Sequence, residues 1–280
     1  MTGRTYGTPL PGMPKGRLSG RLIVIEGADG SGRTTEVAML KEWLEVQGHS
    51  VVDTGLRRST LVSEQIDAAK QGHTLASTTL ALFYAVDFAD QLENKIIPSL
   101  AAGSTVLADR YIYTLMARAI ARGASREWAQ VLYEFALIPD VVIFLEARTD
   151  ILLHRAIMKY GSLDYWESGM DLCLSPDRFD SFFLYQERLR QEFAWMAKPY
   201  GFHRVDANRN PGPVHLEVKR IVAPLYGRPI DRVERPPAGP DRRPITGRGR
   251  SAASSSGASR ASRRRARPDG GTTGTPRPTS

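Results

Sequence analysis

The sequence predicts an α/β domain in which helices cover both faces of a parallel sheet. Short, continuously apolar runs alternate along the chain with longer stretches of helical periodicity. Uninterrupted runs of Val, Ile and Leu are typical of strands that are covered on both faces. A steady alternation of strand and helix favours right-handed crossovers between neighbouring strands. The strand candidates, in order, are Arg21–Ile25, Ser50–Thr54, Thr105–Ala108, Val141–Leu145 and Phe202–Asp206.

Four stretches between and after these runs have helical patterns. The first, Thr35–Gln47, places Val37, Leu40 and Leu44 on one stripe and stops before Gly48, a residue type that commonly follows a helix. The other three are Leu75–Leu92, after which Pro98 interrupts or bends the chain, Arg126–Leu137 and Phe179–Lys198.

The composition is that of a globular protein rather than a membrane or disulfide-rich one. Hydrophobic residues make up 41% of the 280 positions and charged residues 24%. No apolar run approaches the length of roughly 18 residues that spans a bilayer, so no membrane partner is expected. The N-terminus lacks the apolar core of a secretory signal. A single cysteine, Cys173, excludes an intrachain disulfide and fits a cytoplasmic location.

Composition also predicts three regions: a flexible leader at 1–19, a folded domain at 20–228 and a disordered tail at 229–280. The tail holds twelve arginines and four acidic residues, and this excess of eight positive charges equals the formal net charge of +8 for the whole chain. It is rich in Pro, Gly and Ser and has too few large apolar residues to offset chain entropy. The tail is expected to solubilise the protein or to bind polyanions weakly.

A glycine-rich loop follows the first strand candidate and opens the first helix. Its sequence fits G-x-x-x-x-G-K-[ST], with Arg33 at the lysine position. Glycines let backbone N–H groups turn inward around a polyphosphate, and the helix N-terminus adds positive potential. Arg33 would neutralise the β and γ phosphates, and the Thr34 hydroxyl would ligate Mg²⁺. ATP is therefore expected to contact Gly27, Ala28, Asp29, Gly30, Ser31, Gly32, Arg33, Thr34 and Thr35.

The exchange of lysine for arginine leaves two outcomes open. Arginine keeps the charge but replaces a compact ammonium with a planar fork. Arg33 is compatible with slower phosphoryl transfer, or with nucleotide binding without turnover.

A second candidate site stands at the end of the third strand candidate, where Asp109, Arg110 and Tyr111 follow one another. Ligands of open α/β sheets lie at the carboxyl ends of strands, which places Asp109 beside the glycine-rich loop. Asp109 suits Mg²⁺ or its water shell, and Arg110 would hold a phosphoryl group between donor and acceptor. With Arg33, these two residues are the expected catalytic groups; the alternative is a structural Asp109–Arg110 ion pair.

Phosphoryl transfer depends mainly on positioning and charge neutralisation, so further cations matter. Arg57 or Arg58, after the second strand candidate, would bind the acceptor. Arg155 or Arg178 would be a mobile arginine above the transferred group, although each of these two also fits an ordinary surface arginine.

Taken in order, these segments resemble the thymidylate kinase family over about Arg21 to Tyr226. The glycine-rich loop looks like that family's P-loop, and Asp109–Tyr111 matches its D-R-[YWH] motif. The segments Leu82–Asp87 and Ile97–Leu100 are similar to its acceptor helix and the turn that follows. The remaining likeness lies in Val141–Leu145 with Leu152–Arg155, in Asp177–Asp180, and in Tyr185–Trp195 with Val205–Ala207.

The resemblance implies a P-loop NTPase-type three-layer fold with a five-stranded parallel sheet, a lid over ATP and a homodimer. It also implies that the protein uses ATP and Mg²⁺ to convert thymidine monophosphate (dTMP) into the diphosphate (dTDP). Tyr84 would stack on the base, Arg110 would contact the acceptor phosphate, and Arg155 and Arg178 would belong to the lid.

Departures from the family pattern lie mostly on the acceptor side. Phe88 stands where an arginine is usual, and Arg118 stands near the place of a Tyr or Gln. The segment Gly55–Ser59 lacks the usual proline, and the lid segment Tyr160–Pro176 looks enlarged. A pocket that loses polar partners loses discrimination between bases. The expected acceptor-binding residues are Arg57, Tyr84, Phe88, Arg110 and Arg118.

The leading hypothesis is therefore an active kinase for a nucleoside monophosphate, with dTMP ranked first. Alternatives are a kinase for another monophosphate and a nucleotide-binding protein with weak or no catalysis. A GTPase lacks support because no N-K-x-D signature is present, and a nucleoside kinase is disfavoured because Arg57, Arg58 and Arg110 suit a phosphorylated acceptor.

Overall fold

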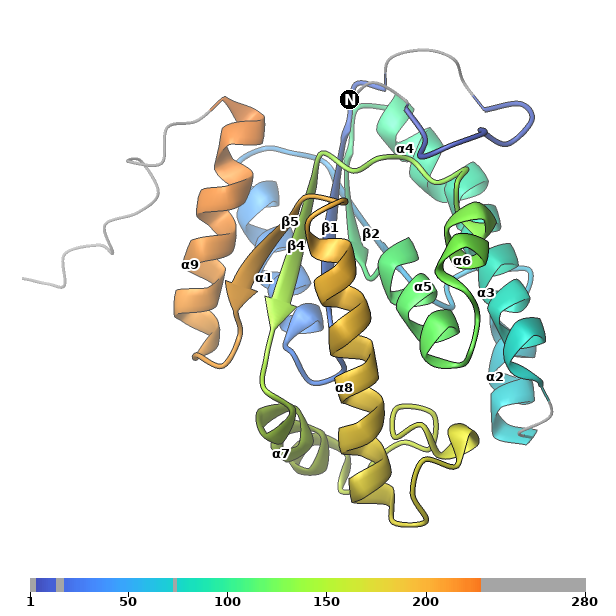
Figure 1. Ribbon diagram of the computed structural model, residues 1–280. Helices are drawn as coiled ribbons and strands as arrows, with labels where there is room; N and C mark the ends of the chain where they lie inside the picture. The colour runs from blue at the N-terminus through green and yellow to red at the C-terminus, as the bar shows by residue number, and fades with distance from the viewer. Residues whose placement is uncertain (1–3, 14–17, 73–74, 228–280) are drawn as a thin grey trace, which may run out of the picture. The chain divides into compact units, whose positions relative to one another are not determined.

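The computed structural model describes residues 4–13, 18–72 and 75–227 (Figure 1). Within these residues, five parallel strands form one sheet in the order β2-β3-β1-β4-β5. The predicted α/β class and five-stranded parallel sheet are confirmed, and each predicted strand boundary lies within two residues of the observed one. The strands are β1 (Arg21–Gly27), β2 (Val51–Gly55), β3 (Thr105–Asp109), β4 (Val141–Glu146) and β5 (Phe202–Asp206).

Helices connect these strands and cover the sheet on both faces (Figure 1). A π-helical turn at Leu92–Ile96 continues α3 into α4, which has Pro98 in its first turn, where a missing N–H is tolerated. The α-helices of the described residues are α1 (Arg33–Val46), α2 (Ser63–Gly72), α3 (Ser77–Gln91), α4 (Ile97–Ala101), α5 (Ile112–Ala121), α6 (Arg126–Leu132), α7 (Thr149–Tyr160), α8 (Arg178–Ala197) and α9 (Pro211–Val222).

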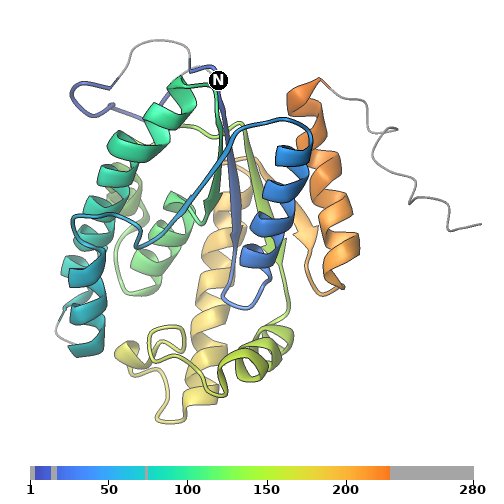
Figure 2. The same ribbon diagram turned by 180° about the vertical axis from the view of Figure 1, so that it is seen from behind.

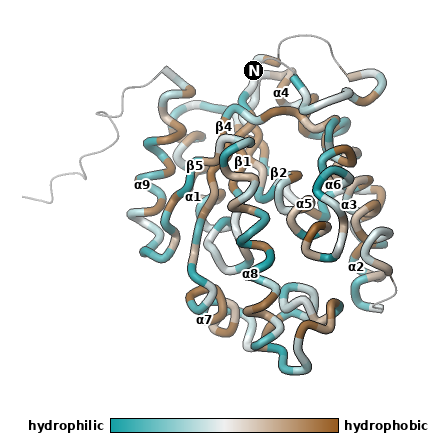
Figure 3. Tube along the Cα trace, viewed as in Figure 1, coloured by the Kyte–Doolittle hydropathy of each residue, from teal (hydrophilic) through white to brown (hydrophobic). Residues whose placement is uncertain are grey.

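The two faces of the sheet have separate hydrophobic cores because side chains alternate along each strand. On β1, Ile23 and Ile25 face α1 and α9, which lie side by side on one face (Figure 2). Leu22 and Val24 belong to the other core, with α3, α5 and α8. The hydropathy of the residues follows this arrangement: along the amphipathic helices α8 and α9, polar and apolar residues alternate (Figure 3).

The strand register brings the two sequence motifs together. Ile25 of β1 is paired with Asp109 of β3, and Gly27 is paired with Leu145 of β4. The glycine-rich loop after β1 and the segment beginning at Asp109 therefore leave the same edge of the sheet side by side. This is the edge at which α/β folds bind their ligands.

One predicted helix was too long, and five α-helices of the described residues were missed. The helix predicted at Arg126–Leu137 ends at Leu132, because Tyr133 leaves the helical conformation with φ at −117° and its ring is buried in the core. Pro139, which follows soon after, also disfavours helical geometry at the residue before it. The helices α2, α4, α5, α7 and α9 were not among the predicted elements.

The start of the described chain lies against the domain. Thr5 forms an isolated antiparallel bridge with Leu137, and the Tyr6 hydroxyl lies 2.6 Å from that of Tyr113. These contacts fall within the segment predicted as a flexible leader; its boundary at residue 19 stays a prediction. The tail predicted at 229–280 lies outside the described residues. Among the described residues, no helix combines the length and the hydropathy that crossing a membrane requires.

Candidate active site

The glycine-rich loop joins β1 to α1 and depends on glycine at several points. Gly30 and Gly32 have φ of 84° and 99°, values that side-chain-bearing residues rarely adopt. A Cβ on Gly27 would lie 2.7 Å from the carbonyl oxygen of Leu145. The backbone can therefore take this path only with glycine, and phosphate binding by the loop stays a prediction.

Arg33 is the first residue of α1 and is 7% exposed. Its Nε donates to Asp109 Oδ1 over 2.9 Å, and its Nη1 donates to the carbonyl oxygens of Gly27 and Ala28. The guanidinium thus lies against the floor of the loop and is oriented by the carboxylate of β3. The predicted closeness of Arg33 and Asp109 is confirmed.

Asp29 of the loop is the point at which three arginines meet. It forms ion pairs with Arg33 (3.4 Å), with Arg110 and, through Oδ2, with Arg118 (2.9 Å). One carboxylate faces three guanidinium groups, so the cluster has an excess of positive charge. Burial, with the charge of Arg118 as the next cause, lowers the pKa of the Arg110 guanidinium to about 9. A phosphate group placed here would relieve this electrostatic cost.

The backbone of Arg110 has φ of 73°, in the left-handed region that non-glycine residues seldom occupy. Such a conformation costs roughly 1–3 kcal/mol and is concentrated at functional sites. Its N–H still donates to Ile25, so the strained residue remains attached to β1 while its side chain turns toward Asp29. Asp109 and Arg110 do not pair with each other among the ion pairs of the described residues, which argues against the purely structural alternative.

Thr34 and Asp109 form the candidate metal site. The Thr34 hydroxyl donates to Asp109 Oδ2 over 3.1 Å, and the two side chains come from α1 and β3. One hydroxyl and one carboxylate suit Mg²⁺, which takes its other ligands from water and phosphate oxygens. No group of three or more metal-binding His, Cys, Asp or Glu side chains occurs in the part of the chain that the structure describes. The residues present therefore fit a phosphate-bound Mg²⁺ better than a metal held by protein alone.

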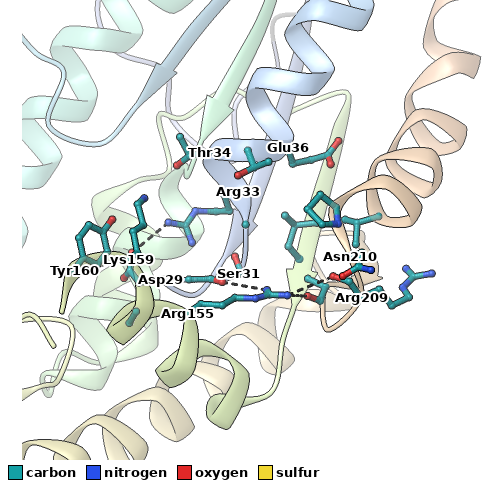
Figure 4. Close-up of a pocket in the computed structure, with 18 of the residues that line it drawn as sticks. Asp29, Ser31, Arg33, Thr34, Glu36, Arg155, Lys159, Tyr160, Arg209 and Asn210 are labelled. Carbon is teal, nitrogen blue, oxygen red and sulfur yellow. Dashed lines mark hydrogen bonds and ion pairs between the residues drawn. The ribbon is translucent and has the colours of Figure 1, made fainter. Parts of the chain in front are cut away.

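A cavity of about 430 Å³ opens above the loop and reaches from α7 to the segment after β5 (Figure 4). It has the volume of a nucleotide site. Arg155 lines it and donates to the carbonyl oxygens of Gly30 (3.3 Å) and Ala207 (3.0 Å); its role as a lid arginine stays a prediction. Lining residues that the sequence analysis did not assign to the site include Lys159 and Tyr160 of α7 and Arg209 after β5.

A second, smaller cavity lies on the other side of Asp29. Tyr84 of α3 and Arg118 of α5 line it, as do Tyr133 and Trp166. The Asp29–Arg118 ion pair therefore spans the two cavities, since Asp29 lines the first and Arg118 the second. This geometry brings together Tyr84 and Arg118, two residues predicted to bind the acceptor.

The other predicted site residues lie elsewhere. Arg57 pairs with Asp67 of α2 and has its backbone N–H fixed by the buried Asp87, and Arg178 donates to the carbonyl oxygen of Leu163. Phe88 packs edge to face on Tyr111 and is 4% exposed. None of Arg57, Phe88 and Arg178 lines either of the two cavities, and their functional roles stay predictions. Phe88 does line a small cavity of about 10 Å³ that Arg110 also borders.

Glu26, the residue before the loop, is fully buried and holds the second motif in place. It accepts hydrogen bonds from the backbone N–H groups of Tyr111 (2.8 Å) and Thr114 (3.2 Å) and from the Thr114 hydroxyl. Burial raises the pKa of its carboxyl above the usual value, although the bonds from Thr114 and Tyr111 oppose the shift. Glu26 does not line the larger cavity, so it acts as a positioning residue for Arg110 and α5.

We expect Glu26→Ala to lower the free energy of unfolding by about 2–5 kcal/mol, because buried donors at Tyr111 and Thr114 lose their acceptor. Glu26→Gln should lose less, because its amide oxygen still accepts. Urea unfolding measures both, with Glu42→Ala on the exposed face of α1 as the control. A Glu26→Ala protein as stable as the Glu42→Ala control would contradict this role.

Both the family model and the similar proteins that match this chain carry the name thymidylate kinase. Residues 25–164 match the family model described as Thymidylate kinase. A protein from Saccharolobus solfataricus named "Probable thymidylate kinase 2" is 32% identical over 206 residues, which cover 73% of this chain and 96% of that protein. A "Probable thymidylate kinase" from Thermococcus kodakarensis is 30% identical, covering 73% and 98%. A "Thymidylate kinase" from Shouchella clausii is 31% identical, covering 68% and 89%.

Proposed function

The chain belongs to the thymidylate kinase family, and we propose that it transfers the γ-phosphoryl group of ATP to dTMP, giving ADP and dTDP. The observation that carries this proposal is the Asp29–Arg118 ion pair. Asp29 lines the large cavity above the phosphate loop, and Arg118 lines the smaller cavity together with Tyr84, so the two cavities are neighbours. A donor and an acceptor nucleotide bound in these cavities would place their phosphates beside Arg33 and Arg110.

ATP occupies the larger cavity, with its phosphates on the backbone N–H groups of Gly27–Thr35. The N-terminus of α1 adds positive potential at the same point. Arg33 reaches the β and γ phosphates from the floor of the loop, and Arg155 approaches from α7. Positioning and charge neutralisation of this kind supply most of the catalysis of phosphoryl transfer.

Mg²⁺ is the metal proposed to accompany ATP, held by the Thr34 hydroxyl and by Asp109 or its water shell. The ion supplies charge neutralisation on the transferring phosphates. The protein's own part is to hold Asp109 in the sheet, where its two oxygens face Arg33 and Thr34.

The acceptor occupies the smaller cavity, with its base against the ring of Tyr84 and its phosphate toward Arg110 and Arg118. Tyr84 is 6% exposed and comes from the middle of α3, so its ring is a rigid wall. Arg110 and Arg118 already share the carboxylate of Asp29, and an incoming phosphate competes for both. Arg57 and Phe88 are proposed as supporting residues at the edge of this site.

Two features favour catalysis over nucleotide binding alone. Arg33 keeps a cation at the N-terminus of α1, where the P-loop lysine stands in the family pattern, and Arg110 holds a strained backbone conformation that a purely structural residue does not need.

We also propose a homodimer, which the exposed apolar side chains of Leu82 and Val86 on α3 support. A cytoplasmic location is proposed with the single cysteine as its support, and weak polyanion binding by 229–280 remains a proposal for residues outside the described structure.

The proposed activity is tested by giving the purified protein Mg-ATP with each of nine nucleoside monophosphates: dTMP, dUMP, UMP, dCMP, CMP, dAMP, AMP, dGMP and GMP. ADP release is then followed. Stimulation by dTMP, alone or with dUMP, is the expected result. A preference for another monophosphate would support kinase activity but show that dTMP is not the acceptor. If ATP bound but none of the nine monophosphates stimulated ADP release, the proposal that the protein is an enzyme would be wrong.

A further inference from the structure

The smaller cavity is narrow. Its volume is about 30 Å³, far below that of the cavity above the phosphate loop. A pyrimidine base needs several times that space, so the acceptor cannot enter until part of the wall moves outward.

Two segments far apart in the sequence form that wall. Trp166 comes from the connection between α7 and α8, and its Nε1 donates to the carbonyl oxygen of Lys70, near the end of α2, over 3.1 Å. The Lys70 Nζ lies 5.9 Å from the centre of the Trp166 ring. Both side chains line the cavity. Their contact joins the two segments at the cavity that Tyr84 also lines.

Trp166 is held in place by Arg122, which stands at the end of α5 and lines the same cavity. Arg122 donates to the Trp166 carbonyl oxygen over 3.1 Å and forms a two-pronged ion pair with Asp171, at 2.8 and 3.1 Å. Its guanidinium also lies 4.9 Å from the centre of the Tyr185 ring. The connection that the sequence marks as an enlarged lid is thus anchored on the acceptor side, while its residue Glu167 also lines the ATP cavity.

We propose that Trp166 and Lys70 form a clasp over the acceptor cavity, which opens to admit the nucleoside monophosphate and then packs on its base. This inference rests on the proposed function and names the residues that select the acceptor. Trp166 supplies a further aromatic side chain to the cavity that Tyr84 lines. Arg122 lines the same cavity and also positions Trp166, whose carbonyl oxygen it binds.

The chemistry of the clasp indicates which bases it accepts. The Lys70 ammonium carries only hydrogen-bond donors, so it pairs with a carbonyl oxygen of a base and not with an amino group. Burial and the charges of Arg118 and Arg57 lower the pKa of Lys70 to about 8, opposed by Asp164 and Glu167, so an acceptor oxygen would stabilise its charged form. Thymine and uracil offer such an oxygen where cytosine has an amino group. The clasp accordingly replaces base contacts that Phe88 does not supply.

Tryptophan fluorescence and calorimetry of the full chain test this clasp, with dTMP as the probe. In the wild type, dTMP should change the fluorescence, and Trp166→Phe should abolish that change while dTMP still binds. Trp166→Ala should weaken dTMP binding roughly 5- to 150-fold, the range for loss of one aromatic–base stack. It should leave the binding of a non-hydrolysable ATP analogue near that of the wild type. Lys70→Met should reduce the ratio of dTMP affinity to dCMP affinity relative to the wild type.

Cys173→Ser is the matched control, because Cys173 is exposed on the same connection and lines neither cavity. An unchanged fluorescence response in Trp166→Phe, or equal losses for dTMP and the ATP analogue in Trp166→Ala, would overturn the clasp and leave the proposed function intact. If dTMP failed to bind the wild type, both would fall. Arg122→Gln, paired with Asp171→Asn in a double-mutant cycle on dTMP affinity, should show coupling; additive effects would contradict the anchoring role.

Discussion

Arg33→Met is expected to lower kcat by roughly 10²- to 10³-fold, the loss typical of removing one preorganised group that stabilises transition-state charge. The guanidinium lies on the floor of the phosphate loop and is aligned by Asp109. Methionine fills a similar length without charge, so the loop should still fold and bind ATP. Steady-state kinetics with Mg-ATP and dTMP measure the effect, and calorimetry with an ATP analogue separates binding from turnover.

Arg33→Lys and Arg220→Met are the matched controls for this prediction. Lysine retains a point charge that binds phosphate, so most of the activity should remain. Arg220 is exposed on α9 and lines neither cavity, so its loss should leave turnover unchanged. A large gain in rate with Arg33→Lys would show that the natural site is attenuated. Equal losses in the Lys and Met variants would contradict a role for positive charge at this position.

Arg110→Gln is expected to lower kcat/KM for dTMP by roughly 10²-fold, because it removes a charge-assisted contact to the acceptor phosphate. The affinity for the ATP analogue should stay close to that of the wild type, because Arg110 does not line the larger cavity. Kinetics at varied dTMP and saturating ATP measure the loss. Glutamine keeps hydrogen-bonding capacity but cannot neutralise a dianion.

The control for Arg110 is Arg126→Gln, which removes an exposed arginine of α6 that pairs with Glu192 of α8 and lines neither cavity. Its kinetic constants should match those of the wild type. If Arg110→Gln lost affinity for the ATP analogue and for dTMP to the same extent, the assignment of Arg110 to the acceptor would be wrong. A fall in melting temperature shared by both nucleotide-free and nucleotide-bound protein would point to a structural role instead.

The sheet and the phosphate loop could be predicted because their signals are local. Runs such as Val141–Leu145 are apolar throughout, and a strand covered on both faces needs nothing else. The spacing of Gly27, Gly30 and Gly32 is set by backbone geometry within one loop. The position of Asp109 followed from the rule that parallel strands end at one edge of the sheet.

The remaining parts of the site depend on contacts between distant segments. Asp29 forms ion pairs with Arg33, Arg110 and Arg118, which come from three separate segments, and no short sequence pattern predicts such contacts. The helix α5, which carries Arg118, was not predicted although its residues are largely buried, because its ten residues form a short apolar run that periodicity alone does not assign.

Trp166 and Lys70 were missed for the same reason, since they are 96 residues apart and meet only in the folded chain. Phe88 shows the opposite case. Its place in the acceptor helix suggested contact with the acceptor, but in the structure its ring packs against Tyr111 and Phe135. Whether it also touches the acceptor stays a prediction.

The most direct test of the central claim is the fate of the γ-phosphoryl group. ATP labelled at the γ position is incubated with Mg²⁺, dTMP and the full-length protein, and the labelled products are separated. The proposed function predicts that the label appears in dTDP, with one ADP formed for each dTDP, and that Arg33→Met slows both together. Label released only as inorganic phosphate, or retained in ATP while dTMP is bound, would contradict it.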